Sequence, residues 1–238
     1  KTAYEYWRDW SSDVCSSDLV IGGDLDMTGN LVDNGTLNFN TRAAFFTGTG
    51  VQDVSGSGTF NIDYIVSNKA SGSIRLLSNL LSEGPNGGNA ITLTNSTDIL
   101  NLNGYTFTLG KASVGSGITG SGSIRGSSSS SISILGTGAL GTINFDQTTP
   151  GTTNVLQNLT INRTSTGTVT LGSALTVGGT LTLTSGDIIT SSTNTLTLTS
   201  AASISGGSSS SYIEGPLDRT LANGSNFTYP IGSRSEEH

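Results

Sequence analysis

Three residue types that carry much of protein chemistry are nearly absent from this chain. It has one cysteine, one histidine and two tryptophans among 238 residues, and all lie close to its ends: Trp7, Trp10, Cys15 and His238. Residues 20–233 contain none of the three types. Nucleophilic sites of the Ser–His–Asp and Cys–His kinds are therefore excluded from this interval, because each uses a histidine as its base. The lack of cysteine fits an exported protein, although a reducing cytosol is equally compatible with it.

Charge is also scarce between residues 20 and 233. This interval has 11 acidic and 7 basic residues, a net charge of −4. A surface that binds nucleic acid needs clustered lysine and arginine to displace the counterions of the phosphates, so we expect no nucleic-acid partner. The basic residues are scattered singly: Arg42, Lys69, Arg75, Lys111, Arg125, Arg163 and Arg219. No apolar run approaches the ~20 residues of a membrane-spanning helix, so no membrane span is expected.

The two ends of the chain resemble translated sequencing-adapter DNA. Residues 1–19 (KTAYEYWRDWSSDVCSSDL) resemble one reading frame of such an adapter, and residues 234–238 (RSEEH) resemble its inner end in the opposite orientation. Tails of this origin are left out of fold reasoning. We therefore expect residues 20–233 to represent the natural protein, as a piece of a longer gene.

The interval between these ends is rich in glycine, serine, threonine, asparagine and short apolar residues. Good surface helix formers are scarce, and no window shows the apolar stripe of an amphipathic helix. Apolar pairs at alternate positions recur instead, as in Leu181-Thr182-Leu183, and turn-forming residues follow each pair. In such a strand the two leucines point to one side and the threonine to the other. The sequence predicts an all-β protein.

The spacing of these short strands predicts their arrangement. Between residues 158 and 207 the apolar pairs begin 6 to 10 residues apart, which is too close for long hairpins. They begin at Leu159, Val169, Leu175, Leu181, Ile188, Leu196 and Ile204. We predict a right-handed parallel β-helix, or β-solenoid, with about three strands and ~20–24 residues per coil and ~9–10 coils. Residues 20–211 would form this solenoid, and residues 212–233 a closing segment that leads into a further module.

An antiparallel β-sandwich is the alternative fold, because it is also built from short strands and turns. In its favour, the dipeptides Asn34-Gly35 and Asn103-Gly104 have the sequence of two-residue hairpin turns and lie between apolar residues.

Other polar residues are expected between the strands. Two serine-rich stretches, residues 127–131 and 208–211, are interpreted as loops that project from the coil. Four asparagines near strand ends are expected in turns rather than in stacked ladders: Asn101, Asn103, Asn158 and Asn162.

Three segments together resemble a known kind of protein. They are FTGTGVQDVSGSGTFNIDYIVSN (residues 46–68), TLTLTSGDIITSSTNTLTLTS (180–200) and SYIEGPLDRTLANGSNFTYPIG (211–232). The chain is similar in these segments to bacterial secreted surface repeat proteins of the adhesin-like, parallel β-helix type. Thr228-Tyr229-Pro230 departs from that pattern, which usually has phenylalanine before the proline. The resemblance implies export to the cell exterior, with the sorting or anchoring parts lying beyond residue 233.

Carboxylates offer little that resembles a site. Residues 24–29 (DLDMTG) have the spacing of the first half of a calcium-binding loop, but Gly35 stands at the twelfth position, where a glutamate is needed. We interpret the segment as a solvated strand and turn. Glycoside cleavage needs two acids across a groove. Asp53 with Asp63, or Asp187 with Glu214, are the available pairs, and isolated surface acids explain them equally well. We expect no catalytic residue, no metal site and no cofactor.

Two classes of function remain, and both place the chain outside the cell or on its surface. The first is a structural or adhesive stalk that recognises an unidentified surface glycan or protein. The second is a solenoid whose Thr-x-Thr rows form a flat array for ice or a crystalline polysaccharide. That array would be made by Thr168, Thr170, Thr180, Thr182, Thr195 and Thr197. A polysaccharide-degrading enzyme of the β-helix type is a distant third.

Overall fold

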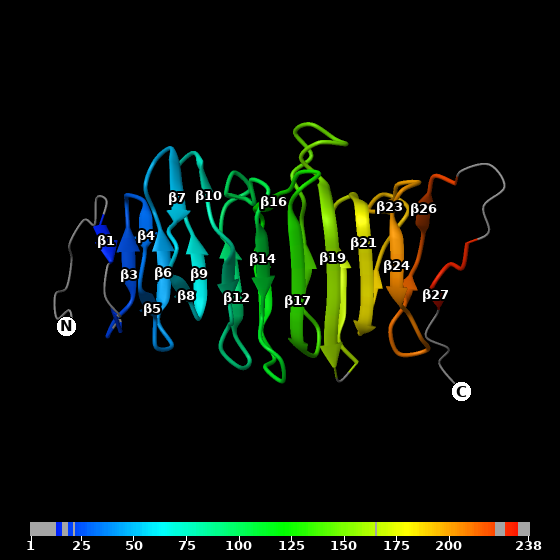
Figure 1. Ribbon diagram of the computed structural model, residues 1–238, viewed down its shortest axis with the longest axis horizontal. Helices are drawn as coiled ribbons and strands as arrows, with labels where there is room; N and C mark the ends of the chain where they lie inside the picture. The colour runs from blue at the N-terminus through cyan, green and yellow to red at the C-terminus, as the bar shows by residue number, and fades with distance from the viewer. Residues whose placement is uncertain (1–12, 16–18, 21, 165, 222–226, 233–238) are drawn as a thin grey trace.

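The computed structural model describes residues 13–15, 19–20, 22–164, 166–221 and 227–232, and this part of the chain contains strands and turns but no helix. The strands stack as a parallel β-solenoid of about 8 turns. Figure 1 shows the rungs side by side along the long axis, with the two ends of the chain at opposite ends of the coil. The prediction of a parallel β-solenoid is confirmed.

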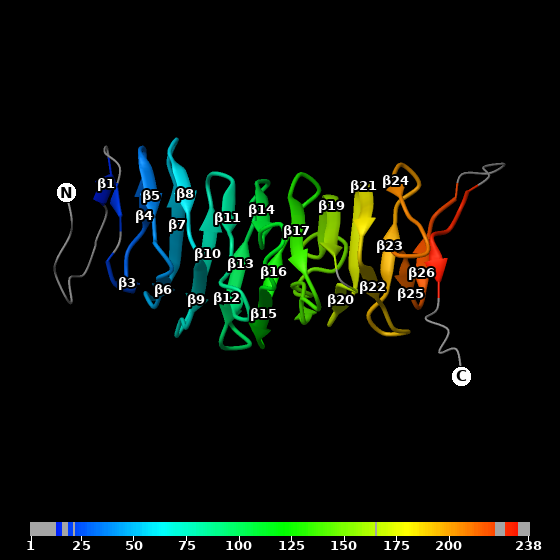
Figure 2. The same ribbon diagram turned by 90° about the horizontal axis from the view of Figure 1, so that it is seen from below.

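Each turn contributes to up to three faces, which Figure 2 shows from a second direction. The first face consists of two successive sheets, and Ile118 at their junction donates its amide to the carbonyl of Leu140 at 2.8 Å. Its strands are β3 (Leu25–Met27), β6 (Ala43–Phe46), β9 (Tyr64–Ser67), β12 (Asn89–Leu93), β15 (Gly117–Gly120), β18 (Thr142–Ile143), β20 (Thr168–Leu171), β22 (Asp187–Ile189), β25 (Ile213–Glu214) and β27 (Ile231–Gly232).

The second face begins with a sheet of β1 (Asp13–Cys15), β4 (Leu31–Asp33), β7 (Val51–Ser55), β10 (Ser73–Leu76), β13 (Ile99–Asn101) and β16 (Ser123–Arg125). The third face begins with β2 (Leu19–Val20), β5 (Thr36–Asn38) and β8 (Thr59–Asn61), and continues through β11 (Leu80–Ser82), β14 (Thr106–Leu109), β17 (Ser131–Thr137), β19 (Val155–Thr164), β21 (Leu175–Ser185) and β24 (Ser203–Gly206).

Toward the C-terminal end, long strands join the second and third faces. In β21 the first part, Leu175–Val177, pairs with β23 (Leu196–Leu198), which pairs with β26 (Leu217–Arg219). The later part of β21 pairs with β24. Gly178 and Gly179 lie between the two parts, where a bend in the strand requires small residues.

Every ladder between the described strands is parallel, so the antiparallel sandwich alternative is wrong. Along the third face the partners Phe107, Ile132, Leu159, Leu181 and Ile204 lie 25, 27, 22 and 23 residues apart. These turns are longer than most of the predicted range, because the corners contain more residues than the strand spacing suggested. The number of turns is correspondingly smaller than predicted.

The interior of the coil is a column of aliphatic and aromatic side chains. In β17 buried and half-buried residues alternate along all seven positions, with Ile132 and Ile134 pointing inward. The same alternation places Leu159, Ile161 and Leu181 in the interior of the next rungs. Burying each such side chain contributes about 1.5–3 kcal/mol relative to leaving it exposed. Packing from rung to rung therefore stabilises strands that are too short to be stable alone.

The two Asn-Gly dipeptides form corners and not hairpin turns. Asn103 and Gly104 have φ angles of 50° and 90°, as a tight turn requires. The strands on either side of them, β13 and β14, pair with strands of neighbouring rungs and not with each other. Asn34-Gly35 lies likewise between β4 and β5, which belong to different sheets. Asn158 and Asn162 lie within β19, so their predicted placement in turns is wrong.

A buried arginine closes one corner. Arg163, which is 0 % exposed, donates to four backbone carbonyls, those of Ser116, Leu135, Thr137 and Gly138, at distances of 2.6 to 2.9 Å. Burial lowers the pKa of its guanidinium from the ordinary value. The side chain satisfies carbonyl groups that the bending chain leaves without a ladder partner, which would otherwise be costly to bury.

The end segments are described only in part. Asp13–Cys15 forms β1, which pairs in parallel with β4, and Leu19–Val20 forms β2, which pairs with β5. Residues 1–12, 16–18 and 234–238, with both tryptophans and the histidine, lie outside the described residues. Their resemblance to adapter sequence stays a prediction. In the expected closing segment, β25, β26 and β27 continue the parallel ladders.

Truncating a residue of the inner column is expected to be costly, whereas truncating its outward neighbour is not. Replacing buried Ile161 by alanine removes packing inside the coil, and we expect the free energy of unfolding to fall by about 2–5 kcal/mol. Thr160→Ala on the same strand should change it by no more than about 0.5 kcal/mol. Urea denaturation of both variants measures the difference. Equal effects would contradict the assignment of the inward and outward sides.

Candidate binding face

The third face carries two parallel columns of short polar side chains over five successive rungs. The register aligns β14, β17, β19, β21 and β24, which Figures 1 and 2 show side by side. The first column consists of Thr106, Ser131, Asn158, Thr180 and Ser203, and the second of Thr108, Ser133, Thr160, Thr182 and Ser205. We call these ten residues the hydroxyl face, since nine of them carry a hydroxyl group and none is ionisable.

Strand geometry determines where these side chains lie. Each alternates with a residue that packs inward, so all ten point away from the core, and all are half-buried or exposed. Neighbouring strands lie ~4.8 Å apart, and residues two apart along a strand are separated by ~6.6 Å. Threonine suits such a position because it is β-branched and polar. The hydroxyl face is therefore a regular, uncharged array of donors and acceptors.

Side-chain hydrogen bonds connect members of the first column. Asn158 Nδ2 donates to Ser131 Oγ at 3.2 Å, and Asn158 Oδ1 accepts the amide of Thr180 at 3.0 Å. The hydroxyls of Thr180 and Ser203 lie 3.1 Å apart. These bonds run from rung to rung, so they hold the column in register and restrict the rotamers of its side chains.

The structure brings only two of the six predicted threonines into this array. Thr180 and Thr182 belong to the hydroxyl face, whereas Thr168 and Thr170 lie on the first face, in register with Asp187 and Ile189. The structure thus separates the predicted rows from one another.

The remaining two threonines lie at and before β23. Thr197 is in register with Thr176 and Asp218. Thr195 accepts a hydrogen bond from the amide of Leu175 at 3.0 Å through its carbonyl, one residue before β23 begins. Neither aligns with Thr180, whose partners are Asn158 and Ser203.

Sequence reasoning missed eight members of the hydroxyl face for identifiable reasons. Ser131 was included in a serine-rich stretch interpreted as a projecting loop, but it begins β17. Ser130, just before it, is buried and accepts the amide of Gly104 through its hydroxyl at 2.9 Å. The Ser-x-Ser pattern of residues 131–133 and 203–205 was the available signal. It is inconspicuous because serine is common throughout the chain.

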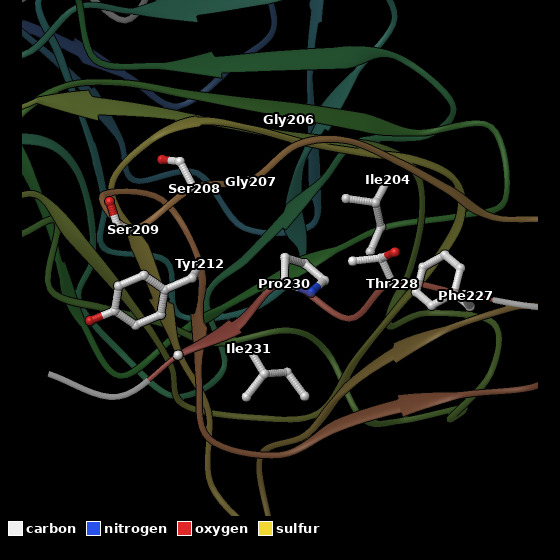
Figure 3. A pocket seen from close by; sticks show the side chains of 11 residues that line it. Ile204, Gly206, Gly207, Ser208, Ser209, Tyr212, Phe227, Thr228, Pro230 and Ile231 are labelled. Atoms are coloured by element: carbon white, nitrogen blue, oxygen red, sulfur yellow. The ribbon is translucent and has the colours of Figure 1, made fainter.

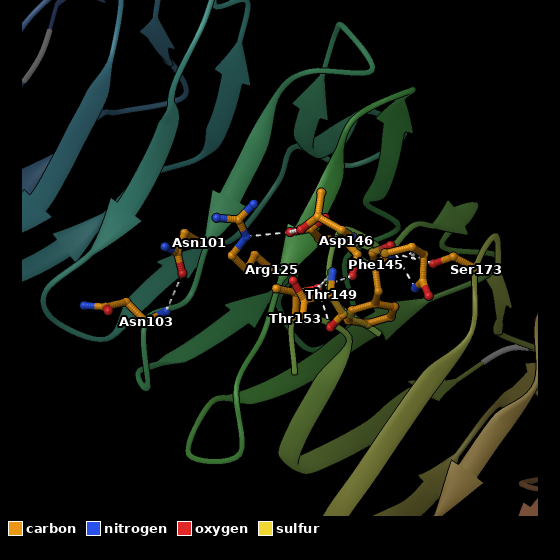
Figure 4. Close-up of polar contacts among 10 residues, drawn as sticks. Asn101, Asn103, Arg125, Phe145, Asp146, Thr149, Thr153 and Ser173 are labelled. Atoms are coloured by element: carbon orange, nitrogen blue, oxygen red, sulfur yellow. Dashed lines mark hydrogen bonds and ion pairs between the residues drawn. The ribbon is translucent and has the colours of Figure 1, made fainter. Parts of the chain in front are cut away.

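The segment that does project lies elsewhere. Residues 146–154 extend beyond the other loops at the top of Figure 1, and Figure 4 shows their polar contacts. Asp146 anchors the start of the segment, with Arg125 Nε 2.5 Å from its Oδ2 and the amide of Thr148 2.9 Å from its Oδ1. Thr153 Oγ1 donates to the carbonyl of Asp146 at 2.8 Å, which ties the end of the loop to its beginning.

The acids singled out from the sequence make structural contacts. In the calcium-like segment, Asp24 Oδ1 accepts the amide of Ala43 at 3.0 Å, and Asp26 Oδ1 accepts the hydroxyl of Thr47 at 2.5 Å. Both bonds join neighbouring rungs. Within the described ranges no group of three or more Asp, Glu, His or Cys residues is placed to hold a metal ion.

The proposed acid pairs have separate partners. Asp53 is held by two bonds from Arg75, at 2.8 and 2.9 Å, and Asp63 Oδ2 accepts the amide of Thr41 at 2.5 Å. Asp187 is buried, and its Oδ1 accepts the amide of Tyr212 at 3.3 Å. Glu214 lies on β25, in register with Ile189 of β22.

One open cleft lies near the C-terminal end of the coil and has a volume of about 620 Å³. Ile204, Tyr212, Phe227, Pro230 and Ile231 supply its apolar walls, as Figure 3 shows, together with backbone at residues 206–209. None of the residues that line the cleft is an aspartate or glutamate. The cleft thus combines aromatic and aliphatic surface without an acid that could take part in glycoside cleavage.

Comparison with known proteins gives no match to a family model, to a curated protein or to a solved structure. Among the described residues there is no helix long and apolar enough to cross a membrane.

The anchor of the projecting loop predicts an acid-sensitive contribution to stability. Burial raises the pKa of Asp146, but hydrogen bonds from Thr148 and Arg125, with the charge of Arg125, outweigh it, so the pKa lies below its ordinary value of 3.8. Protonation then favours the unfolded chain. This stabilisation is present above the unfolded pKa of ~3.9 and is lost as pH falls through the lower folded pKa.

Urea denaturation between neutral pH and pH ~3 tests this expectation. Asp146→Asn should unfold more easily than the parent chain at neutral pH, and the difference should shrink in acid. Asp218, which is exposed on β26, provides the matched control through Asp218→Asn. A difference between Asp146→Asn and the parent that stays constant with pH would show that the carboxylate does not act as an ionised anchor.

Proposed function

We propose that this chain is a non-catalytic structural and adhesive segment of an extracellular bacterial surface protein. The observation that carries the proposal is the hydroxyl face, an uncharged array held on a continuous solenoid core. The resemblance to secreted adhesin-like repeat proteins supports the extracellular location and the bacterial source. In this proposal the coil is a stiff spacer, and its third face makes the adhesive contact.

The composition of the hydroxyl face supports recognition by many weak contacts. Each hydroxyl group is one donor and two acceptors, so the array can bond to the hydroxyl groups of a glycan in either sense. Short side chains on a rigid sheet lose little conformational entropy when they bind, which lowers the cost of association. A repeating partner would engage several rungs at once, and the contacts would reinforce one another.

A second candidate function is binding to an ordered solid, either ice or a crystalline polysaccharide. The alignment of two columns over five rungs favours it, because the strand spacing repeats regularly along the coil. Serine and Asn158 interrupt the threonines, so methyl groups are missing from half of the ten positions. The solid would therefore be recognised chiefly through hydrogen bonds.

Substitutions on the hydroxyl face should weaken adhesion to a glycan. In Thr160→Lys/Thr182→Lys, two long charged side chains stand on the central rungs and keep a flat partner at a distance. We expect sedimentation with insoluble cellulose, chitin or peptidoglycan to show binding by the parent chain and about tenfold weaker binding by this variant, or about 1.4 kcal/mol. Thr168→Lys/Thr170→Lys adds the same charge to the first face and should bind like the parent. Equal binding by both variants would contradict the proposal.

The second candidate makes a separate prediction for ice. If the array orders water in an ice-like arrangement, the parent chain will inhibit recrystallisation in a frozen sucrose solution. Thr160→Lys/Thr182→Lys should abolish this inhibition, while the first-face variant should retain it. Ice growth that the parent chain leaves unchanged would remove ice as the partner.

A further inference from the structure

A buried lysine and a buried glutamine lie in contact at a corner between the first and second faces. Lys69 follows β9, and Gln52 is the second residue of β7, one rung earlier. They are 2 % and 1 % exposed. Lys69 Nζ donates to Gln52 Oε1 in a very short contact, and to the carbonyl of Gly48 at 2.5 Å.

The carboxamide of Gln52 is held at all its polar positions. Its Nε2 donates to the carbonyls of Met27 and Gly29 at 2.9 and 2.6 Å, and its Oε1 accepts the amide of Gly48 at 3.0 Å. A Cβ atom on Gly48 would lie 2.1 Å from the carbonyl oxygen of Thr28 and 3.0 Å from Gln52 Cδ. Only glycine therefore lets the backbone approach the carboxamide this closely.

The surroundings of Lys69 favour its uncharged amine. Neither group that accepts from Nζ is ionised, and burial lowers the pKa of the side chain. The carboxylate of Asp98 opposes this shift, but burial is the larger effect. Asp98 accepts the backbone amide of Lys69 at 2.9 Å and that of Asn95 at 2.8 Å, so its two oxygens already have backbone partners. An uncharged lysine amine is a nucleophile.

We infer that Lys69 and Gln52 join in an intramolecular isopeptide bond. The lone pair of Nζ forms a bond to Gln52 Cδ, and the carbonyl electrons move to Oε1, where the Gly48 amide stabilises the negative charge. The bond between Cδ and Nε2 then breaks, one Nζ proton passes to the departing nitrogen, and ammonia leaves. The exchange of one amide for another needs no oxidant or reductant. Fixing the two groups in contact supplies the high effective concentration that such a reaction needs.

The cross-link would tie two neighbouring rungs covalently at their corner. Residues 52 and 69 enclose β8 and β9, so the bond would bridge the stretch of chain that a pulling force has to open first at this rung. The inference depends on the fold and not on the proposed function. Adhesion can fail while the bond forms, and the bond can be missing while adhesion persists.

Mass spectrometry of the purified full chain tests the bond directly. We expect an intact mass one molecule of ammonia below that of the sequence. Trypsin should leave residues 43–75 as one peptide, because Lys69 is the only internal cleavage site and an acylated lysine is not cut. Chymotrypsin cleavage at Phe60 or Tyr64 should then yield two pieces that stay joined. Fragmentation should locate the junction at Gln52 and Lys69.

Variants distinguish this bond from other losses of ammonia. Lys69→Arg and Gln52→Glu should each show the full mass of their own sequence. Lys111→Arg is the matched control, since Lys111 pairs with Glu83 at the surface at 2.8 Å, and it should keep the deficit. A parent chain of full mass that yields separate peptides 43–69 and 70–75 would overturn the inference. Loss of ammonia that maps to an asparagine would overturn it equally. The digest of the parent chain decides the question even if the variants fail to fold.

Discussion

The structure depends on the packing of inward side chains from one rung onto the next. Phe107, Ile132, Leu159 and Leu181 are register partners on successive strands, and each is at most 2 % exposed. A strand of three or four residues buries too little surface to be stable alone. The parallel ladder and the aliphatic column therefore form together, and each rung is the template for the next. The same packing leaves every second side chain free of a structural role on the outer side.

Corners create the main difficulty for such a coil, because the bending chain turns carbonyl and amide groups away from the ladders. Two of the seven basic residues between residues 20 and 233 are used there. Arg163 satisfies four carbonyls at one corner, and Lys69 with Gln52 fills another. Asparagine serves the same purpose at the surface, as where Asn79 Oδ1 accepts the amide of Thr106 from the next rung at 2.9 Å. With polar groups committed to the corners, the flat parts of the third face can carry small neutral residues.

Local pattern in the sequence was sufficient for the strands and for the parallel coil. Leu181-Thr182-Leu183 shows which residues point inward, and short spacing excluded long hairpins. The pattern was insufficient for anything that depends on register between rungs. The distance between partners varies from 22 to 27 residues with the length of each corner, so Thr180 aligns with Ser203 and not with a threonine of residues 195–197. The Asn-Gly dipeptides misled for a related reason, since the same φ angles suit a hairpin and a corner. Nothing in the local sequence distinguished Arg163 from a surface arginine.

The direction of neighbouring strands is the most direct test of this account, and nuclear Overhauser contacts in the isotope-labelled protein report it. The structure predicts backbone contacts that connect Leu159 with Ile132 on one side and with Leu181 on the other, in step along all three strands. It also predicts that β13 and β14, on either side of Asn103-Gly104, make no backbone contacts with each other. Strong contacts between Hα atoms across that dipeptide, with residue numbers that run in opposite directions, would show an antiparallel hairpin and contradict the solenoid.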